Sequence, residues 1–245
     1  MENLDALLRT YAEQYETADF LPEDPSWFMH QVAGAENQEV TAFVASCLSY
    51  GSRKQFMPKI QSLLDFSDKD MYNWVLFGKY EKDIPDDDTT CFYRLYTMHT
   101  MRTLFSALRD MLSEYGSIGN FVNSNSTDGH SAVCAITKYF SAKGIKTIIP
   151  KNASSACKRV CMFLRWMVRD GSPVDLGLWR GFIDKRTLIM PMDTHVVQEA
   201  LKLGLISSKA GSMSTAIKLT RRLVEIFPDD PLKGDFALFG YGVNH

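Results

Sequence analysis

The sequence lacks long apolar runs, clustered cysteines and strand-like alternation between hairpin turns. No apolar stretch approaches the roughly 20 residues of a membrane-spanning helix, so we expect no membrane partner. The start, MENLD, has no basic region of the kind that opens a secretory signal. The five cysteines are scattered, and no spacing among them matches a zinc or iron–sulfur site. We therefore expect buried reduced thiols, no metal, no cofactor, and a cytoplasmic location.

What the sequence does have is helical periodicity along nearly its whole length. Near the start, Leu4, Leu7, Leu8 and Tyr11 recur at the i, i+3, i+4 and i+7 spacing of one helix face. Comparable patterns predict further helices over residues 39–50, 56–66, 68–77, 99–115, 129–140, 153–169, 194–203, 212–226 and 232–241. We therefore predict an all-α protein.

The net charge of −2 conceals an uneven distribution along the chain. Residues 151–222 contain 13 lysines and arginines against five acidic residues, an excess of eight positive charges. Residues 1–150 carry 13 basic and 20 acidic residues. A basic block in an acidic chain is a candidate surface for a polyanion. A basic face that contacts only solvent is the alternative.

The segment 191–196 reads PMDTHV and leads into an apolar helical pattern that closes at Gly204. Pro191 favours an extended backbone, so Asp193 falls at the position where a helix begins. As an N-cap, its carboxylate would accept a backbone N–H and stabilise the helix by about 1 kcal/mol. A carboxylate held ionised at the positive end of a helix is also suited to stabilising a cation. Both interpretations stay open from the residues alone.

Lys158 lies on the predicted helix over 153–169, which has a marked apolar stripe. Helical spacing places Arg165 and Arg169 on the same edge as Lys158, and Arg159 follows it directly. Like charges and apolar surroundings both favour the neutral amine of a lysine, which is a nucleophile. A solvated lysine on a basic face is the competing interpretation.

Several other residues are candidate contacts for a substrate or for nucleic acid. Trp166 and Trp179 could stack on a flat ligand or pack a domain junction. His195 could be catalytic or could orient its neighbours at the start of the helix. Ser52 and Arg53 follow a glycine turn that could approach a phosphate or simply connect two helices.

The segment PMDTHV with LGL at 203–205 resembles the active-site segment of helix-hairpin-helix DNA glycosylases of the endonuclease III and adenine-glycosylase type. The segment 158–164, KRVCMFL, looks like the second helix of their hairpin, which begins with the catalytic lysine of bifunctional members. The segments FLRWMVR, VDLGLW and DFALFG at 163–169, 174–179 and 235–240 resemble an uncharacterised, mainly bacterial family of that superfamily. The glycine-rich hairpin is replaced by a longer segment, IPKNASS at 149–155, and the cysteines that bind the iron–sulfur cluster are missing.

The resemblance implies two helical domains that flank a cleft, one formed by residues 26–170 and the other by 1–25 with 171–245. Asp193 and Lys158 would be the catalytic residues. The implied function is excision of a damaged base from DNA, with or without cleavage of abasic sites, by a monomer without an iron–sulfur cluster. The alternative is a non-catalytic nucleic-acid or nucleotide-binding protein that retains the fold.

Overall fold

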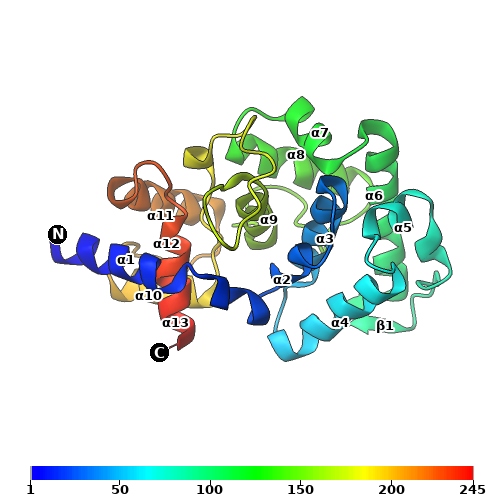
Figure 1. Cartoon of the computed structure of the whole chain (residues 1–245), viewed down its shortest axis with the longest axis horizontal. Coiled ribbons are helices and arrows are strands. Elements are labelled where there is room, and N and C mark those ends of the chain that lie inside the picture. Colours follow the sequence, from blue (N-terminus) through cyan, green and yellow to red (C-terminus); the bar gives the residue numbers. More distant parts are fainter. Residues whose placement is uncertain (1, 245) are drawn as a thin grey trace. The chain divides into compact units, whose positions relative to one another are not determined.

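The computed structural model describes residues 2–244, of which Figure 1 shows the helices and strands. Helices account for 61% of the chain and strands for 3%, so the all-α prediction is confirmed. The chain forms two compact units. The terminal unit comprises the described parts of Met1–Pro22, Ser126–Cys134 and Asn152–His245, and the central unit comprises Glu23–Asn125 and Ala135–Lys151.

These units divide the chain differently from the division at residue 170 expected from the sequence. Helix α9 (Lys158–Val168) belongs to the terminal unit. The segment after α9 folds back onto it, because the N–H groups of Leu176 and Trp179 donate to the carbonyl oxygens of Trp166 and Met167 over 2.8 and 2.7 Å. These bonds tie α9 to the C-terminal part of the chain.

The central unit is built around α3 (Ala35–Leu48), in which every residue from 39 to 48 is buried. Helix α3 contacts α2, α4, α5 and α7, and Phe43 stacks on Phe140 of α8 with ring centroids 5.1 Å apart. The remaining elements of this unit are α2 (Trp27–His30), α4 (Arg53–Phe66), α5 (Met71–Leu76), η2 (Lys79–Glu81), α6 (Met98–Tyr115), α7 (Ile118–Asn125) and part of α8 (Gly129–Ala142).

A β-hairpin and a helix of the central unit correct the sequence prediction. Strands β1 (Cys91–Tyr93) and β2 (Tyr96–Thr97) form an antiparallel hairpin, although the sequence shows no strand-like alternation with hairpin turns. The strands are too short to give a readable alternation, and their turn contains Arg94 at φ +52°. Helix α7 was also missed, because its first turn depends on a distant residue: the buried Glu39 accepts the N–H of Gly119 at 2.9 Å.

The terminal unit contains α1, α9 and the helices that follow α9 in the chain. Helix α1 (Glu2–Tyr15) leads into η1 (Ala18–Glu23), which ends at the border with the central unit. After α9 come η3 (Lys185–Thr187), α10 (Thr194–Lys202), α11 (Met213–Ile226), α12 (Lys233–Asp235), the π-helical turn η4 (Phe236–Gly240) and α13 (Tyr241–Asn244). The single helix expected over 232–241 is thus interrupted by a π-helical turn.

Aromatic packing joins the first two helices, α1 and η1, to α13 and the π-helical turn η4. Tyr11 stacks on Tyr241 with centroids 4.4 Å apart, and Phe20 meets the edge of Phe236 at 5.5 Å. A Cβ atom added to Gly240 would lie 2.5 Å from Tyr15, so only glycine permits this close approach. The first helix of the chain is therefore held against the last ones.

No helix among residues 2–244 is both long enough and apolar enough to cross a bilayer. The five cysteines are free thiols. Three are buried as expected, but Cys91 is exposed on the hairpin and Cys134 is half-buried, so burial of the cysteines is confirmed only in part.

Candidate active site

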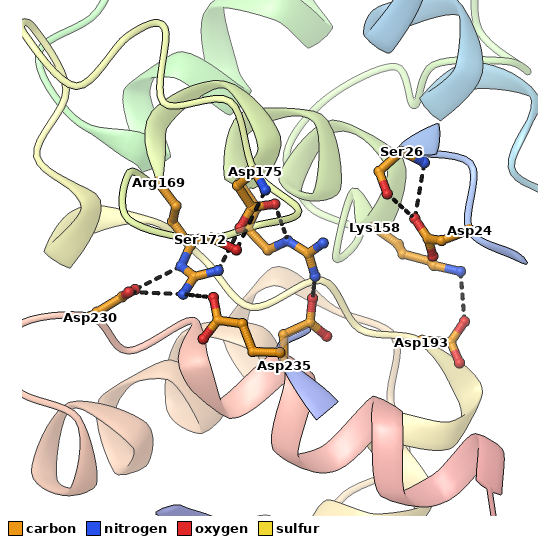
Figure 2. A network of polar contacts seen from close by, with 11 residues as sticks. Asp24, Ser26, Lys158, Arg169, Ser172, Asp175, Asp193, Asp230 and Asp235 are labelled. Atoms are coloured by element: carbon orange, nitrogen blue, oxygen red, sulfur yellow. Dashed lines mark hydrogen bonds and ion pairs between the residues drawn. The ribbon is translucent and has the colours of Figure 1, made fainter. Parts of the chain in front are cut away.

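Lys158 and Asp193 meet in the terminal unit, although 35 residues separate them in the sequence. Lys158 Nζ donates to Asp193 Oδ2 over 2.6 Å (Figure 2). The side chain of Lys158 is 35% exposed and that of Asp193 is 17% exposed. The amine is therefore reachable from solvent, whereas the carboxylate is mostly covered.

Asp193 has the capping role that its position predicts. It is the N-cap of α10, in an extended backbone conformation, and its Oδ1 accepts the N–H of His195 at 2.9 Å. The two carboxylate oxygens therefore have different partners, one the helix backbone and the other Lys158. Burial acts to raise the pKa of Asp193, but the charge and hydrogen bond of Lys158 together with the His195 N–H lower it below its usual value.

Lys158 is fixed by the unusual start of its helix. Helix α9 begins five residues later than the sequence predicts, because the preceding segment pairs with the segment before α11. Ala156 N–H donates to Gly211 O at 2.9 Å, and Met213 N–H donates to Ser154 O at 3.1 Å. These bonds satisfy backbone groups that would otherwise continue the helix, and they make Lys158 its first residue.

Cys157, directly before Lys158, has the left-handed backbone conformation, with φ +45° and ψ +39°. This conformation costs a residue with a side chain about 1–3 kcal/mol, and it persists only when its surroundings impose it. The thiol is buried within 3.5 Å of Asn152 O and Ser155 Oγ, and burial raises its pKa. This turn therefore sets the direction in which the chain enters α9.

Of the other predicted site residues, His195 and Arg159 lie beside the pair in sequence and in the same unit. The His195 ring lies edge-on to Phe239, with ring centroids 6.0 Å apart. Both His195 and Arg159 are half-buried. Ser52 is exposed and Arg53 half-buried at the start of α4, and both belong to the central unit.

Arg165 and Arg169 require a correction. We expected them to form an exposed basic edge with Lys158, but they are 4% and 1% exposed. Arg165 pairs with Asp175 and Asp235, and Arg169 pairs with Asp175, Asp230 and Glu16; Figure 2 shows much of this network. Burial acts to lower the pKa of Arg169, but its carboxylate partners, Asp175 foremost, raise it. Both guanidinium groups thus bind carboxylates inside the protein rather than phosphates.

The two tryptophans are corrected for the same reason. Trp166 and Trp179 are 0% and 1% exposed, so neither side chain can stack on a ligand. Trp179 packs its ring edge-on against Phe163, with centroids 5.2 Å apart. Both tryptophans therefore pack inside the terminal unit, next to or on α9, instead of stacking on a ligand.

The aspartates of this buried network were not identified as functional from the sequence. Asp175 and Asp235 each follow or precede apolar residues in the segments VDLGLW and GDFALF. A carboxylate inside an apolar segment needs a buried partner, and that signal could have matched them to the arginines of α9. Burial raises the pKa of both groups, against the opposing effect of Arg165.

Among the described side chains, no group of three or more histidine, cysteine or acidic residues has the arrangement of a metal site. The chemistry available at the Lys158–Asp193 pair is that of an amine and a carboxylate. The pair can exchange a proton over 2.6 Å, offer a nucleophile, and place a negative charge beside a developing cation.

A family model matches residues 24–244, which covers nearly all of the central unit and all of the terminal unit except residues 1–22 and 245. The chain belongs to the DUF2400 family. The family is described as one of proteins of unknown function. No curated protein and no solved structure matches the chain.

In this DUF2400 protein, the matched region includes every residue of the candidate site. Lys158, Asp193 and His195 lie within it, as do all the helices from α2 onwards.

Proposed function

We propose that this protein is a DNA base-excision glycosylase of the helix-hairpin-helix type, in which Lys158 also gives the enzyme abasic-site lyase activity. The observation that carries the proposal is the contact of Lys158 Nζ with Asp193 Oδ2 at 2.6 Å, at the N-terminus of α10. The resemblance of the segments around both residues to such glycosylases supports it. The two helical domains flanking a cleft, which that superfamily has, are part of the same proposal.

The reaction would act on a nucleotide turned out of the duplex. Asp193 accepts a proton from Lys158 Nζ, which leaves a neutral amine. The amine's lone pair forms a bond to C1′ while the bond between C1′ and the base breaks, and that bonding pair departs with the base. The departing base takes up the proton held by Asp193. The carboxylate is then charged again and stabilises the positive charge of the ammonium adduct at C1′.

Opening of the sugar ring converts this adduct to a Schiff base between Nζ and C1′. Loss of a proton from C2′ then expels the 3′ phosphate, and the strand is cleaved. Borohydride reduces the Schiff base to a stable amine and so traps the protein on the DNA. Trapping therefore reports the covalent step directly.

The test is to incubate the protein with duplexes containing oxidised, alkylated, mismatched or abasic sites, with and without borohydride. The wild-type protein should release a base and form a trapped adduct with at least one substrate. Lys158→Gln should abolish the adduct. Asp193→Asn should greatly reduce base release while the helix remains capped, because asparagine caps as well as aspartate.

Lys202→Gln is the matched control, because Lys202 also pairs with a carboxylate over 2.6 Å but is 67% exposed and lies at the other end of α10. It should trap like wild type. The proposal fails if the wild-type protein releases no base and forms no adduct across the whole panel. Salt-sensitive DNA binding that Asp193→Asn leaves unchanged, without any chemistry, would favour a non-catalytic nucleic-acid-binding protein.

A further inference from the structure

A second feature of the terminal unit is a groove of about 670 Å³ between α11 and the segment that follows α10. One wall consists of residues 204–208, and the other consists of residues on one side of α11, namely Thr215, Lys218, Arg221 and Arg222. None of these residues belongs to the Lys158–Asp193 pair or to the buried arginine network.

The basic residues of this groove are available to a ligand. Lys218 and Arg221 are exposed, and neither forms a hydrogen bond or an ion pair with any residue that the structure describes. Arg222 differs, because it pairs with Glu225. Lys218 and Arg221 are three residues apart on a helix, so their side chains emerge on the same side, with Cβ atoms about 5–6 Å apart.

The residues that line the groove carry charge of one sign. Residues 203–222 include four lysines and arginines and no acidic residue, in a chain that has 29 acidic residues in total. None of the residues that line the groove is acidic. An anion in the groove would therefore meet two uncompensated cations and no carboxylate on the walls.

The opposite wall is ordered and carries hydroxyl groups. Helix α10 ends with Gly204 at φ +67°, where Leu205 N–H donates to Ala200 O and Gly204 N–H donates to Leu201 O. This pattern is a Schellman motif, which fixes the path of the chain that follows. Ser207 and Ser208 come next in the chain and are exposed, so their hydroxyls can donate to phosphate oxygens at the groove.

The composition of the walls distinguishes among phosphate ligands. No aromatic side chain lines the groove, so it has nothing on which a nucleobase could stack. Leu205 and Ile206 offer apolar surface, which suits a sugar. The groove has two adjacent cations and hydroxyl donors but no aromatic surface for a base. It therefore fits a sugar–phosphate backbone better than a free nucleotide.

We propose that this groove binds the phosphodiester backbone of duplex DNA through Lys218 and Arg221. The inference deepens the proposed function and rests on it for the identity of the polyanion. The groove supplies a contact with the DNA backbone in a chain that has no glycine-rich hairpin to provide one.

The test measures binding of a short, undamaged, fluorescently labelled duplex as a function of salt. Lys218→Gln with Arg221→Gln should weaken binding about tenfold and lower the slope of log affinity against log salt by about 2. Lys218→Arg with Arg221→Lys keeps both charges and should bind like wild type. Arg180→Gln with Lys233→Gln removes the same charge from exposed positions of the same unit that do not line the groove, and is the matched control.

The inference is overturned if the groove and control variants weaken binding equally, or if the wild-type protein does not bind duplex DNA. A groove variant that loses only its binding to phosphatidylserine vesicles would also overturn it, in favour of a membrane surface. Failure of the proposed function looks different: no base release and no adduct, with selective loss of duplex binding in the groove variant. If the wild-type protein forms the adduct and the groove variant binds duplex DNA as wild type does, the proposed function stands and the DNA-binding role of this groove is rejected.

Discussion

Arg169 binds Asp230 through two parallel hydrogen bonds, Nε to Oδ1 and Nη2 to Oδ2, each 2.8 Å long. Arg169→Met should lower the free energy of unfolding by roughly 3–5 kcal/mol, because it leaves buried carboxylates without their cation. Urea denaturation monitored by circular dichroism measures this. Arg186→Met is the control: Arg186 pairs with Asp184 at the surface, and its loss should leave the unfolding midpoint nearly unchanged. Equal midpoints for the two variants would contradict a stabilising role for the buried pair.

Helical spacing identified the face of α9 that carries Arg165 and Arg169, but it could not show that this face is buried. Periodicity reports which residues share a face, whereas burial depends on what packs against it. The partners of Arg165 are Asp175 and Asp235, which are 10 and 70 residues away from it in the sequence. A basic stripe read alone therefore suggested a solvated face.

For the Lys158–Asp193 pair, by contrast, part of the structure could be predicted from the sequence. The N-cap role of Asp193 is local, because it depends on the extended residue itself and the N–H two residues later, and the sequence predicted it. The pairing with Lys158 was suggested by the order of the two segments and by the resemblance. The starting residue of α9 could not be predicted, because it depends on pairing of residues 154–156 with 211–213.

The pKa of Asp193 should rise when Lys158 is replaced by methionine. The substitution removes the charge and the hydrogen bond that lower this pKa, while burial, which raises it, remains. Carbon-detected NMR titration of the side-chain carboxyl measures the change, and Lys202→Met, at the far end of α10, should leave the pKa of Asp193 as in wild type. An unchanged pKa in Lys158→Met would show that the two groups do not pair in solution.

The same pair should make stability depend on pH in the acidic range. The folded pKa of Asp193 is below its unfolded value of about 3.9. Its contribution is therefore fully present above that unfolded value and is lost as the pH falls through the folded pKa. The Tm of wild type should fall more steeply than that of Lys158→Met as the pH falls through this range. Parallel curves would contradict the linkage.

Gly204 should be intolerant of alanine, since its φ of +67° lies in the left-handed region. A side chain there costs about 1–2 kcal/mol, although an added Cβ would meet nothing within 4 Å. Gly181 is the matched control, because an added Cβ there is also free of contacts and its φ is not positive. Gly204→Ala should lower the urea midpoint, and Gly181→Ala should not. Similar midpoints would show that the end of α10 relaxes without cost.

Cys91 should be the first thiol to react in the native protein, because it is the exposed one, on the β1–β2 hairpin. Cys157 and Cys161 are buried, and burial raises the pKa of both thiols, which lowers the fraction present as the reactive thiolate. Ellman's reagent should therefore show a fast phase of one thiol before unfolding and five thiols in denaturant. Cys91→Ser should remove the fast phase, and Cys157→Ser should leave it intact. A fast phase that persists in Cys91→Ser but disappears in Cys157→Ser would mean that the turn before α9 opens readily, and Lys158 would then not be rigidly held against Asp193.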